Sequence, residues 1–303
     1  MTSLIETTGL EKKFGRVRAL DGLDLSVTAG EVHGFLGPNG AGKSTTIRVL
    51  LGLMRASAGS ASVFGLDPWK DHVAIHRDVA YVPGDVSLWP TLTGGQSIDL
   101  LADLRGGVDE KLRAELIRDF ELDQKKKARS YSKGNRQKVA LVAAFARRAK
   151  LYVFDEPTAG LDPVMESVFR RQIDRVKADG ATVLLSSHIL SEVEELCDRV
   201  TIIRAGRTVE TGTLSSMRHL TRTNFRVTTG APAASLATLA GVHDVRREAD
   251  ALVFDADTDR LPSVLTALTG LGIDDLKVSP ISLEELFLRH YSEEAGSTPA
   301  ALA

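Results

Sequence analysis

The chain has 303 residues, a formal net charge of −2 at pH 7 and a sequence pI near 6.4. No overall basic excess therefore favours nucleic-acid binding, although these totals do not exclude a local basic patch. Its single cysteine, Cys197, excludes an internal disulfide, and no stretch approaches the roughly 18 consecutive apolar residues of a membrane-spanning helix. The length predicts two domains with ample hydrophobic core, in a protein of the cytoplasm.

The first predicted elements surround a glycine-rich turn. An apolar strand over 32–36 precedes the turn, and apolar residues at helical spacing over 47–54 follow it. The turn fits the phosphate-binding pattern G-x-x-x-x-G-K-[ST], in which glycines let the backbone approach phosphate oxygens. Lys43 can reach the outer phosphates and the Ser44 hydroxyl can hold Mg²⁺, whereas an ordinary turn with an exposed lysine is the plainer alternative. The predicted nucleotide-binding residues here are Gly37, Pro38, Asn39, Gly40, Ala41, Gly42, Lys43, Ser44 and Thr45.

Two carboxylates end a predicted strand further along the chain. Residues 85–148 have a mainly helical pattern, and an apolar strand over 151–154 then leads to Asp155 and Glu156. Asp155 is placed to hold Mg²⁺ through water, and Glu156 to orient or deprotonate an attacking water. An acidic pair that merely caps the next helix is the alternative, and the phosphate-binding lysine upstream makes it the weaker one.

A histidine follows the next predicted strand, which covers 182–186. A lone histidine is more often structural than catalytic, but His188 lies just past a strand end, where open α/β sheets bind their ligands. Further strands are predicted at 200–203 and 208–211. The pattern therefore predicts an α/β domain with its ligand groups at one edge of the sheet.

The last part of the chain has a pattern of its own. Strands are predicted at 225–227, 242–246, 252–255 and 275–278, with helices at 234–239 and 261–271. This βαββαβ order is that of a ferredoxin-like α+β domain. A closing helix over 283–291 begins at capping-box spacing, and residues 292–303 are expected to form a disordered tail.

Further short motifs stand between and around these elements. One aromatic residue, Phe14, precedes the phosphate loop, and Asp162 closes the segment Ala-Gly-Leu-Asp after Glu156. A signature-like segment consists of Tyr131, Ser132, Lys133, Gly134 and Asn135. With the phosphate loop, the two carboxylates and His188, these motifs resemble the ATP-binding subunit of an ABC transporter over residues 4 to about 220. In that family the aromatic stacks on adenine, and the histidine acts as a switch.

The resemblance implies a fold, a domain organisation and an assembly. It implies an α/β P-loop NTPase domain over 1–220 with a helical subdomain at about 85–148, followed by an accessory domain over 221–291. Two copies are expected to sandwich two ATP molecules, with the phosphate loop of one copy facing Ser132 and Gly134 of the other. Signature residues 133 and 135 and the loop aspartate at 162 are implied nucleotide contacts.

The implied activity is hydrolysis of ATP with Mg²⁺, carried by Lys43, Glu156 and His188. It would drive export of a drug, antibiotic or lipid-like compound through separate membrane subunits, at the cytoplasmic face of a bacterial membrane, with no nucleic acid as partner. The closing sequence over 282–288 resembles that of antibiotic-exporter subunits, which is all that separates this interpretation from an importer subunit. Ribosome-acting relatives carry two ATPase halves, and DNA-repair relatives carry a long coiled coil; neither feature is visible here.

The chain departs from the family pattern at two places. The signature has lysine and asparagine at positions 133 and 135, which we interpret as a feature of bacterial exporter members. Gly84 stands where the family has a glutamine that contacts Mg²⁺ and the attacking water. Because glycine has no side chain, either water or the neighbouring Asp85 must substitute, and Asp85 is therefore a further candidate metal ligand.

Overall fold

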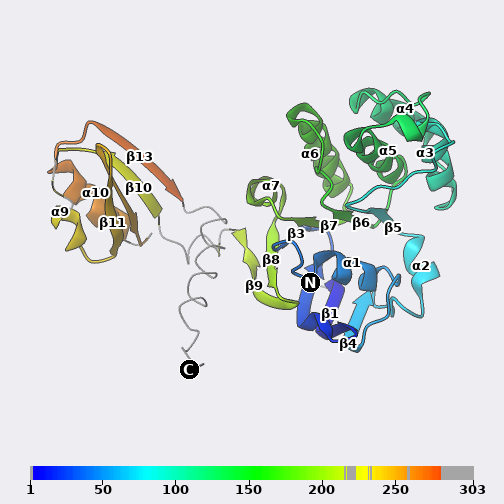
Figure 1. Ribbon diagram of the computed structural model, residues 1–303, viewed down its shortest axis with the longest axis horizontal. Helices are drawn as coiled ribbons and strands as arrows, with labels where there is room; N and C mark the ends of the chain where they lie inside the picture. Colours follow the sequence, from blue (N-terminus) through cyan, green and yellow to red (C-terminus); the bar gives the residue numbers. More distant parts are fainter. Residues whose placement is uncertain are drawn as a thin grey trace. The chain divides into compact units, whose positions relative to one another are not determined.

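The computed structural model describes residues 3–214, 216, 223–230, 232, 234–257 and 260–280. The chain divides into two compact units, Met1–Gly212 and Thr213–Ala303, which are coloured from blue to green and from yellow to orange in Figure 1. No helix in the described ranges is long and apolar enough to cross a membrane. The predicted closing helix over 283–291 and the tail over 292–303 lie outside the described residues.

A six-stranded sheet runs through the middle of the first unit, in the order β5-β6-β7-β3-β8-β9. Neighbouring strands are parallel from β5 to β8. Every residue of β3, β6 and β7 is buried, as expected for parallel strands that are covered on both faces. The strands are β3 Val32–Leu36, β5 Val79–Val82, β6 Leu151–Asp155, β7 Thr182–Ser187, β8 Arg199–Arg204 and β9 Arg207–Thr213.

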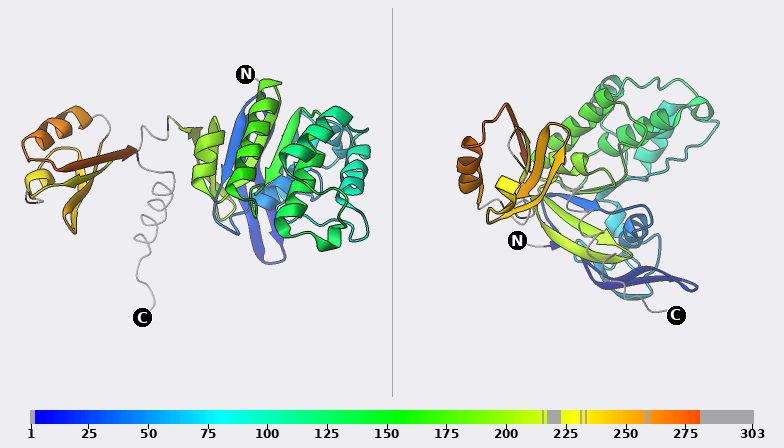
Figure 2. Two further views of the ribbon diagram at one scale, coloured as in Figure 1. Left: turned by 90° about the horizontal axis from the view of Figure 1, so that it is seen from above. Right: turned by 60° about the vertical axis from the view of Figure 1, so that its left-hand side comes forward.

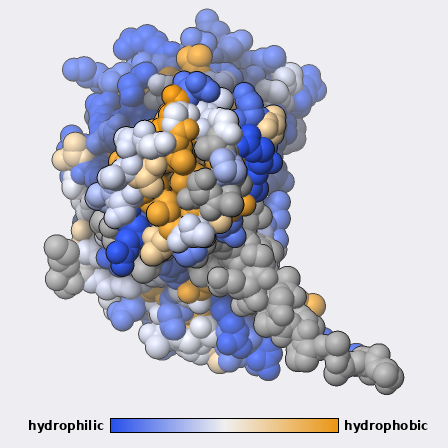
Figure 3. Space-filling model, turned by 90° about the vertical axis from the view of Figure 1, so that its left-hand side faces the viewer, coloured by the Kyte–Doolittle hydropathy of each residue, from blue (hydrophilic) through white to orange (hydrophobic). Residues whose placement is uncertain are grey.

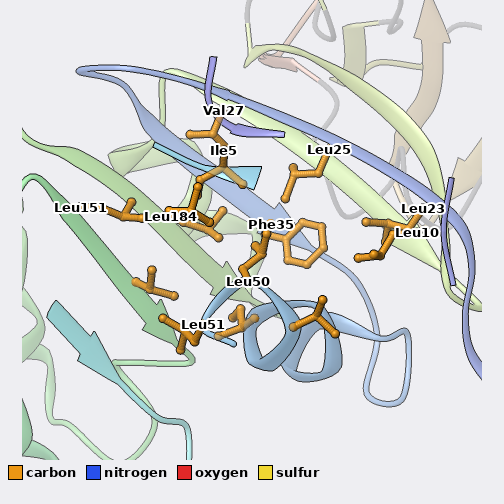
Figure 4. Close-up of a cluster of buried hydrophobic side chains, with 14 of the residues drawn as sticks. Ile5, Leu10, Leu23, Leu25, Val27, Phe35, Leu50, Leu51, Leu151 and Leu184 are labelled. Carbon is orange, nitrogen blue, oxygen red and sulfur yellow. The ribbon is translucent and has the colours of Figure 1, made fainter. Parts of the chain in front are cut away.

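A second, antiparallel sheet in the order β2-β1-β4 shares a core with the central sheet. Its strands and the two helices beside it are β1 Ser3–Phe14, β2 Val17–Thr28, β4 Ala58–Val63, α1 Lys43–Leu50 and α2 His72–His76. Figure 4 shows how side chains from both sheets and from α1 meet in this core. Burial of each such leucine, isoleucine or phenylalanine contributes roughly 1.5–3 kcal/mol. The core therefore fixes α1, and the loop before it, against the carboxyl end of β3.

The other helices of the first unit lie on the opposite side of the central sheet from α1 (Figures 1 and 2). They are α3 Gly94–Asp103, α4 Glu110–Asp119, a 3-10 turn Ala128–Ser130, α5 Lys133–Phe145, α6 Pro163–Ala178 and α7 Leu190–Leu196. Phe145 of α5, Phe154 of β6 and Phe169 of α6 pack together with ring centroids 5.3–6.2 Å apart. These aromatic contacts attach α5 and α6 to the strand that carries Asp155.

The second unit is a four-stranded antiparallel sheet in the order β11-β12-β10-β13. Its elements are β10 Thr223–Thr228, α9 Ala234–Ala237, β11 Val242–Glu248, β12 Ala251–Ala256, α10 Leu261–Thr269 and β13 Asp275–Pro280. This is the predicted ferredoxin-like order. Phe225 and Phe254 stack in its core, with centroids 4.9 Å apart. Figure 3 shows apolar surface bordered by hydrophilic residues on the side that faces its viewer. Among the described residues of this unit, the large exposed apolar side chains are Leu265, Leu276 and Val278.

Candidate active site

The carboxyl ends of three parallel strands meet at one edge of the central sheet. In the register of the sheet, Leu36 of β3 pairs with Ser187 of β7, and Asp155 of β6 pairs with Ser186 of β7. Because these strands are parallel, the segments that follow them emerge side by side. The fold thus brings together three segments that are far apart in sequence: the phosphate loop, the Asp155–Glu156 pair and the segment around His188.

The phosphate loop requires glycine at two points for steric reasons. A Cβ at position 37 would lie 2.5 Å from the carbonyl oxygen of Ile203, and one at position 42 would lie 2.9 Å from that of Ala19. Gly42 also has φ +112°, a backbone conformation that other residues rarely adopt. These two glycines therefore allow the loop to pack closely against β2 and β8.

The N-terminus of α1 lacks a side-chain cap, unlike the other helices of eight or more residues described in the first unit. Gly42 occupies the capping position and has no side chain, and the first turn of α1 has no acidic residue. The first amide groups of the helix therefore lack the oxygen acceptor that a cap would supply. Such amides, together with the helix dipole, form a ready anion-binding site.

Lys43 is buried inside this loop, with only 5% of its side chain exposed. Its ammonium group donates to the carbonyl oxygen of Gly37 at 2.6 Å and to that of Pro38 at 3.3 Å. The same nitrogen lies 3.4 Å from Oε1 of Glu156. The positive charge is thus held within the loop, in contact with the carboxylate of Glu156, which directly follows β6.

Glu156 lies between two groups of the predicted site. Its Oε1 is 3.4 Å from Lys43 Nζ and 3.3 Å from Nδ1 of His188, whose side chain is 45% exposed. The backbone of Glu156 has φ +51°, which is rare for a residue with a side chain. Its amide group donates to the backbone oxygen of Ser186 at 3.1 Å and to its hydroxyl at 3.3 Å. A conformation of this kind costs about 1–3 kcal/mol and persists only where its surroundings enforce it.

Asp155 is buried directly behind Glu156. Its side chain accepts a 2.5 Å hydrogen bond from the hydroxyl of Ser186. Burial raises the pKa of nearby Tyr81 to about 12, with a smaller contribution from the negative charge of Asp155. In the part of the chain that the structure describes, no three His, Cys, Asp or Glu side chains cluster as a metal site.

Gly84 packs against the strand end that carries Asp155. A Cβ at position 84 would lie 3.1 Å from the backbone oxygen of Asp155, which is tighter than an ordinary contact. The loop thus approaches the strand more closely than a residue with a side chain allows without a small shift. Asp85 is exposed and has no hydrogen bond or ion pair to any described residue. Its role as a metal ligand stays a prediction.

The signature segment leads into α5. Ser132 is exposed and caps the helix, accepting a 3.3 Å bond from the amide of Asn135. A Cβ at Gly134 would lie 2.3 Å from the backbone oxygen of Gly160, so this segment packs on the loop after Glu156. In the described ranges, none of the residues 132–135 forms a hydrogen bond or ion pair with the phosphate loop.

Asp162 and Phe14, two further predicted site residues, form no hydrogen bond or ion pair with Lys43, Glu156 or His188 among the described residues. Asp162 caps α6, accepting a 3.0 Å bond from the amide of Met165, and helix capping is the plainer role for an acidic residue in this loop. Phe14 is 48% exposed at the end of β1, with the ammonium group of Lys12 5.2 Å from its ring centre. An exposed ring of this kind is available for stacking on a flat ligand.

Comparison with known proteins identifies the family. The model for the ABC transporter family matches residues 20–159. The daunorubicin resistance ATP-binding protein DrrA3 of Streptomyces coeruleorubidus is 34% identical over 298 residues, covering 94% of each chain. The chain belongs to the ATP-binding subunits of ABC transporters. It is therefore an ATP-binding protein and an ATPase, as the sequence predicted.

Solved structures of this family share the fold of the first unit. A solved ATP-binding subunit of an ABC transporter is 34% identical, with a TM-score of 0.66 over 72% of this chain and 93% of the other. A dimeric ATP-binding cassette, MJ0796, bound to ADP and phosphate is 24% identical, with a TM-score of 0.63 over 69% of this chain and 98% of the other. The predicted P-loop NTPase fold is confirmed.

Two residues that hold this ABC ATPase site together carry no local signal in the sequence. Ser186 contacts both Asp155 and Glu156, and the buried side chain of Gln137 donates to the carbonyl oxygen of Pro157 at 2.9 Å. Ser186 lies in a predicted strand and Gln137 in a predicted helix, where nothing local marks them as site residues. A polar residue at an otherwise apolar, inward-facing position was the only available signal.

Proposed function

We propose that this chain hydrolyses ATP at the shared edge of β3, β6 and β7 and thereby drives export of a drug-like or lipid-like compound through separate membrane subunits. The observation that carries the proposal is the position of the Glu156 carboxylate, 3.4 Å from Lys43 Nζ and 3.3 Å from His188 Nδ1. A carboxylate and two nitrogen groups thus meet beside the phosphate loop, which supports the proposal. Charge and positioning supply most of the catalysis in phosphoryl transfer.

The proposed roles follow from the chemistry of each side chain. The amides of the loop and Lys43 bind the phosphates, and Glu156 accepts the proton of the water that attacks the γ-phosphorus. His188 orients that carboxylate and the transferred phosphoryl group. The oxygens of Ser44 and Asp155 suit Mg²⁺, which neutralises charge on the phosphates when bound. ADP and inorganic phosphate leave as products.

We propose that a homodimer forms the complete site. Ser132 is exposed, and no signature residue forms a hydrogen bond or ion pair with the phosphate loop of its own chain within the described residues. A second copy can therefore present residues 132–135 to the bound nucleotide, with Phe14 stacked on the adenine. The similarity to MJ0796, a dimeric ATP-binding cassette with bound ADP and phosphate, supports this assembly.

We further propose a peripheral location on the cytoplasmic face of a bacterial membrane. The support is the similarity to a protein named for daunorubicin resistance over 94% of both chains. Residues 1–220 would form the ATPase domain and 221–291 an accessory domain, with the boundary close to the division between the two compact units. The membrane subunit, and with it the contacts that select the exported compound, belongs to another polypeptide.

The decisive experiment measures ATP turnover with and without that membrane subunit. The chain is co-expressed with its candidate partner, purified from the membrane fraction and assayed with Mg-ATP while drug-like compounds are screened for stimulation. Wild type should hydrolyse ATP and respond to at least one compound, and Lys43→Ala should show neither activity. Turnover without any membrane association would support only the ATPase part of the proposal.

The role of Asp85 needs its own experiment, because Gly84 lacks the expected side chain. Under the proposal that Asp85 acts on Mg²⁺ through water, Asp85→Ala requires more Mg²⁺ for half-maximal turnover. The compensating variant Gly84→Gln/Asp85→Ala would recover only part of the loss, since a Cβ at position 84 lies 3.1 Å from the backbone of Asp155. An unchanged Mg²⁺ requirement in Asp85→Ala would assign the contact to water alone.

A further inference from the structure

Glu192 of α7 is a buried carboxylate that none of the nucleotide-binding motifs includes. Only 6% of the residue is exposed. Its Oε1 accepts a 2.5 Å hydrogen bond from the hydroxyl of Thr158, and its Oε2 accepts one of 2.8 Å from the hydroxyl of Ser187. No lysine, arginine or histidine among the described residues forms an ion pair with it. Its polar contacts among the described residues are thus two hydroxyl groups, one in the loop after β6 and one at the end of β7.

The two hydroxyls belong to the segments that carry the proposed catalytic side chains. Thr158 is buried two residues after Glu156. Ser187 directly precedes His188, and its oxygen also accepts a 2.8 Å bond from the amide of Ile189 on the other side of that histidine. One carboxylate therefore connects the loop after β6 to the end of β7, next in sequence to His188.

The physical cost of this arrangement argues for a role beyond filling space. Burial of a carboxylate without a cation is unfavourable, and hydrogen bonds to a charged acceptor offset the cost when both oxygens are satisfied. An apolar residue at position 192 would avoid that cost, but it could not hold two hydroxyl groups at fixed positions. The left-handed backbone of Glu156, at φ +51°, needs such fixed surroundings.

We infer that Glu192 is a positioning residue, which holds Glu156 and His188 in register through Thr158 and Ser187. The inference rests on the proposed catalytic roles of those two residues. Oε1 of Glu156 and Nδ1 of His188 are 3.3 Å apart, so a small relative movement of the two loops would break their contact. A displacement of about 1 Å can lower a rate by roughly 10²-fold. Loss of the link should therefore slow hydrolysis while the phosphate loop still binds ATP.

The test compares Glu192→Gln with Glu195→Gln on the same helix. Glutamine keeps the shape of Glu192 but replaces one acceptor oxygen by an amide nitrogen, so only one of the two hydroxyls can still donate its proton to residue 192. We expect kcat to fall roughly 10- to 100-fold, with the Kd for ATP within about twofold of wild type. Glu195 forms an exposed ion pair with Arg170, and its substitution should change neither quantity. A Glu192→Gln protein that is less stable to heat but retains kcat below its melting range would overturn the inference.

A second pair of variants tests the link if Glu192→Gln does not fold. Thr158→Ser keeps the hydroxyl and should keep the rate, whereas Thr158→Val keeps the shape and should lose it. Where Glu192→Gln does fold, adding Thr158→Val to it should cause little further loss, because the shared interaction is already broken. Equal rates for the serine and valine variants would refute the role of this hydroxyl. Near-normal turnover by Glu156→Gln would instead refute the proposed base, so the two failures are distinguishable.

Discussion

The contact between Gly134 and Gly160 makes a quantitative prediction about the variant Gly134→Ala. The added methyl carbon would lie 2.3 Å from the backbone oxygen of Gly160, about 1 Å short of ordinary van der Waals contact. The obstructing atom belongs to the backbone, so no flexible side chain can move aside. Either the start of α5 or the loop after Glu156 must shift by a comparable distance.

The cost can be estimated from similar overpacked sites. Forcing an extra carbon into a packed contact typically costs about 1–3 kcal/mol. For a domain of this size, each kcal/mol lowers Tm by about 2–4 °C, so we expect a fall of roughly 2–12 °C. Because the affected loop begins at Glu156, a shift of about 1 Å should also lower kcat by up to roughly 10²-fold.

The assay is thermal denaturation together with steady-state ATP turnover at a temperature where the variant is fully folded. Gly230→Ala is a matched control, since a Cβ there meets nothing within 4 Å. It should leave Tm and kcat unchanged. If Gly134→Ala melted within about 1 °C of wild type and kept kcat within twofold, this contact would not constrain the loop, and the steric reasoning would be wrong.

Four further predictions follow from the site and the core. Lys43→Ala should lower ATP turnover to background and weaken nucleotide binding in calorimetry, because the loop loses its buried charge; near-normal turnover would contradict its role. Glu156→Gln should hydrolyse ATP at least ~10²-fold more slowly and accumulate an ATP-bound dimer in size-exclusion chromatography, whereas wild-type rates would exclude it as the base. A chain lacking 221–303 should keep its ATP affinity, and loss of binding by a folded truncation would place part of the site in the second unit. Burial alone would raise the pKa of Glu31, but hydrogen bonds from His33 and the Thr28 amide hold that pKa below its ordinary value. The ionised carboxylate therefore contributes to stability above about pH 4.3, and this contribution is lost as the pH falls through the lower pKa of the folded state. In urea denaturation, the free energy of unfolding should fall less between pH 6 and pH 3.5 for Glu31→Gln than for wild type.

The sequence by itself determined the fold class and the local parts of the site. The phosphate loop is a contiguous motif, and Asp155 and His188 each follow a predicted apolar strand. Because carboxyl ends of parallel strands meet at one edge, the proximity of these groups could be expected from the strand pattern alone. The βαββαβ order of the second unit was equally predictable, since it depends on hydrophobic periods within short segments.

Only the tertiary structure decided how these parts support one another. Thr158 and Glu192 are 34 residues apart, and no periodic pattern or spacing predicts that their side chains meet in a buried hydrogen bond. The contact of Gly134 with Gly160 likewise depends on how α5 packs on the sheet. Local propensity and motif chemistry act along the chain, whereas the burial of a particular carboxylate or the closeness of two backbones is set by packing between elements. The positioning of Glu156 and His188 is therefore a property of the folded domain.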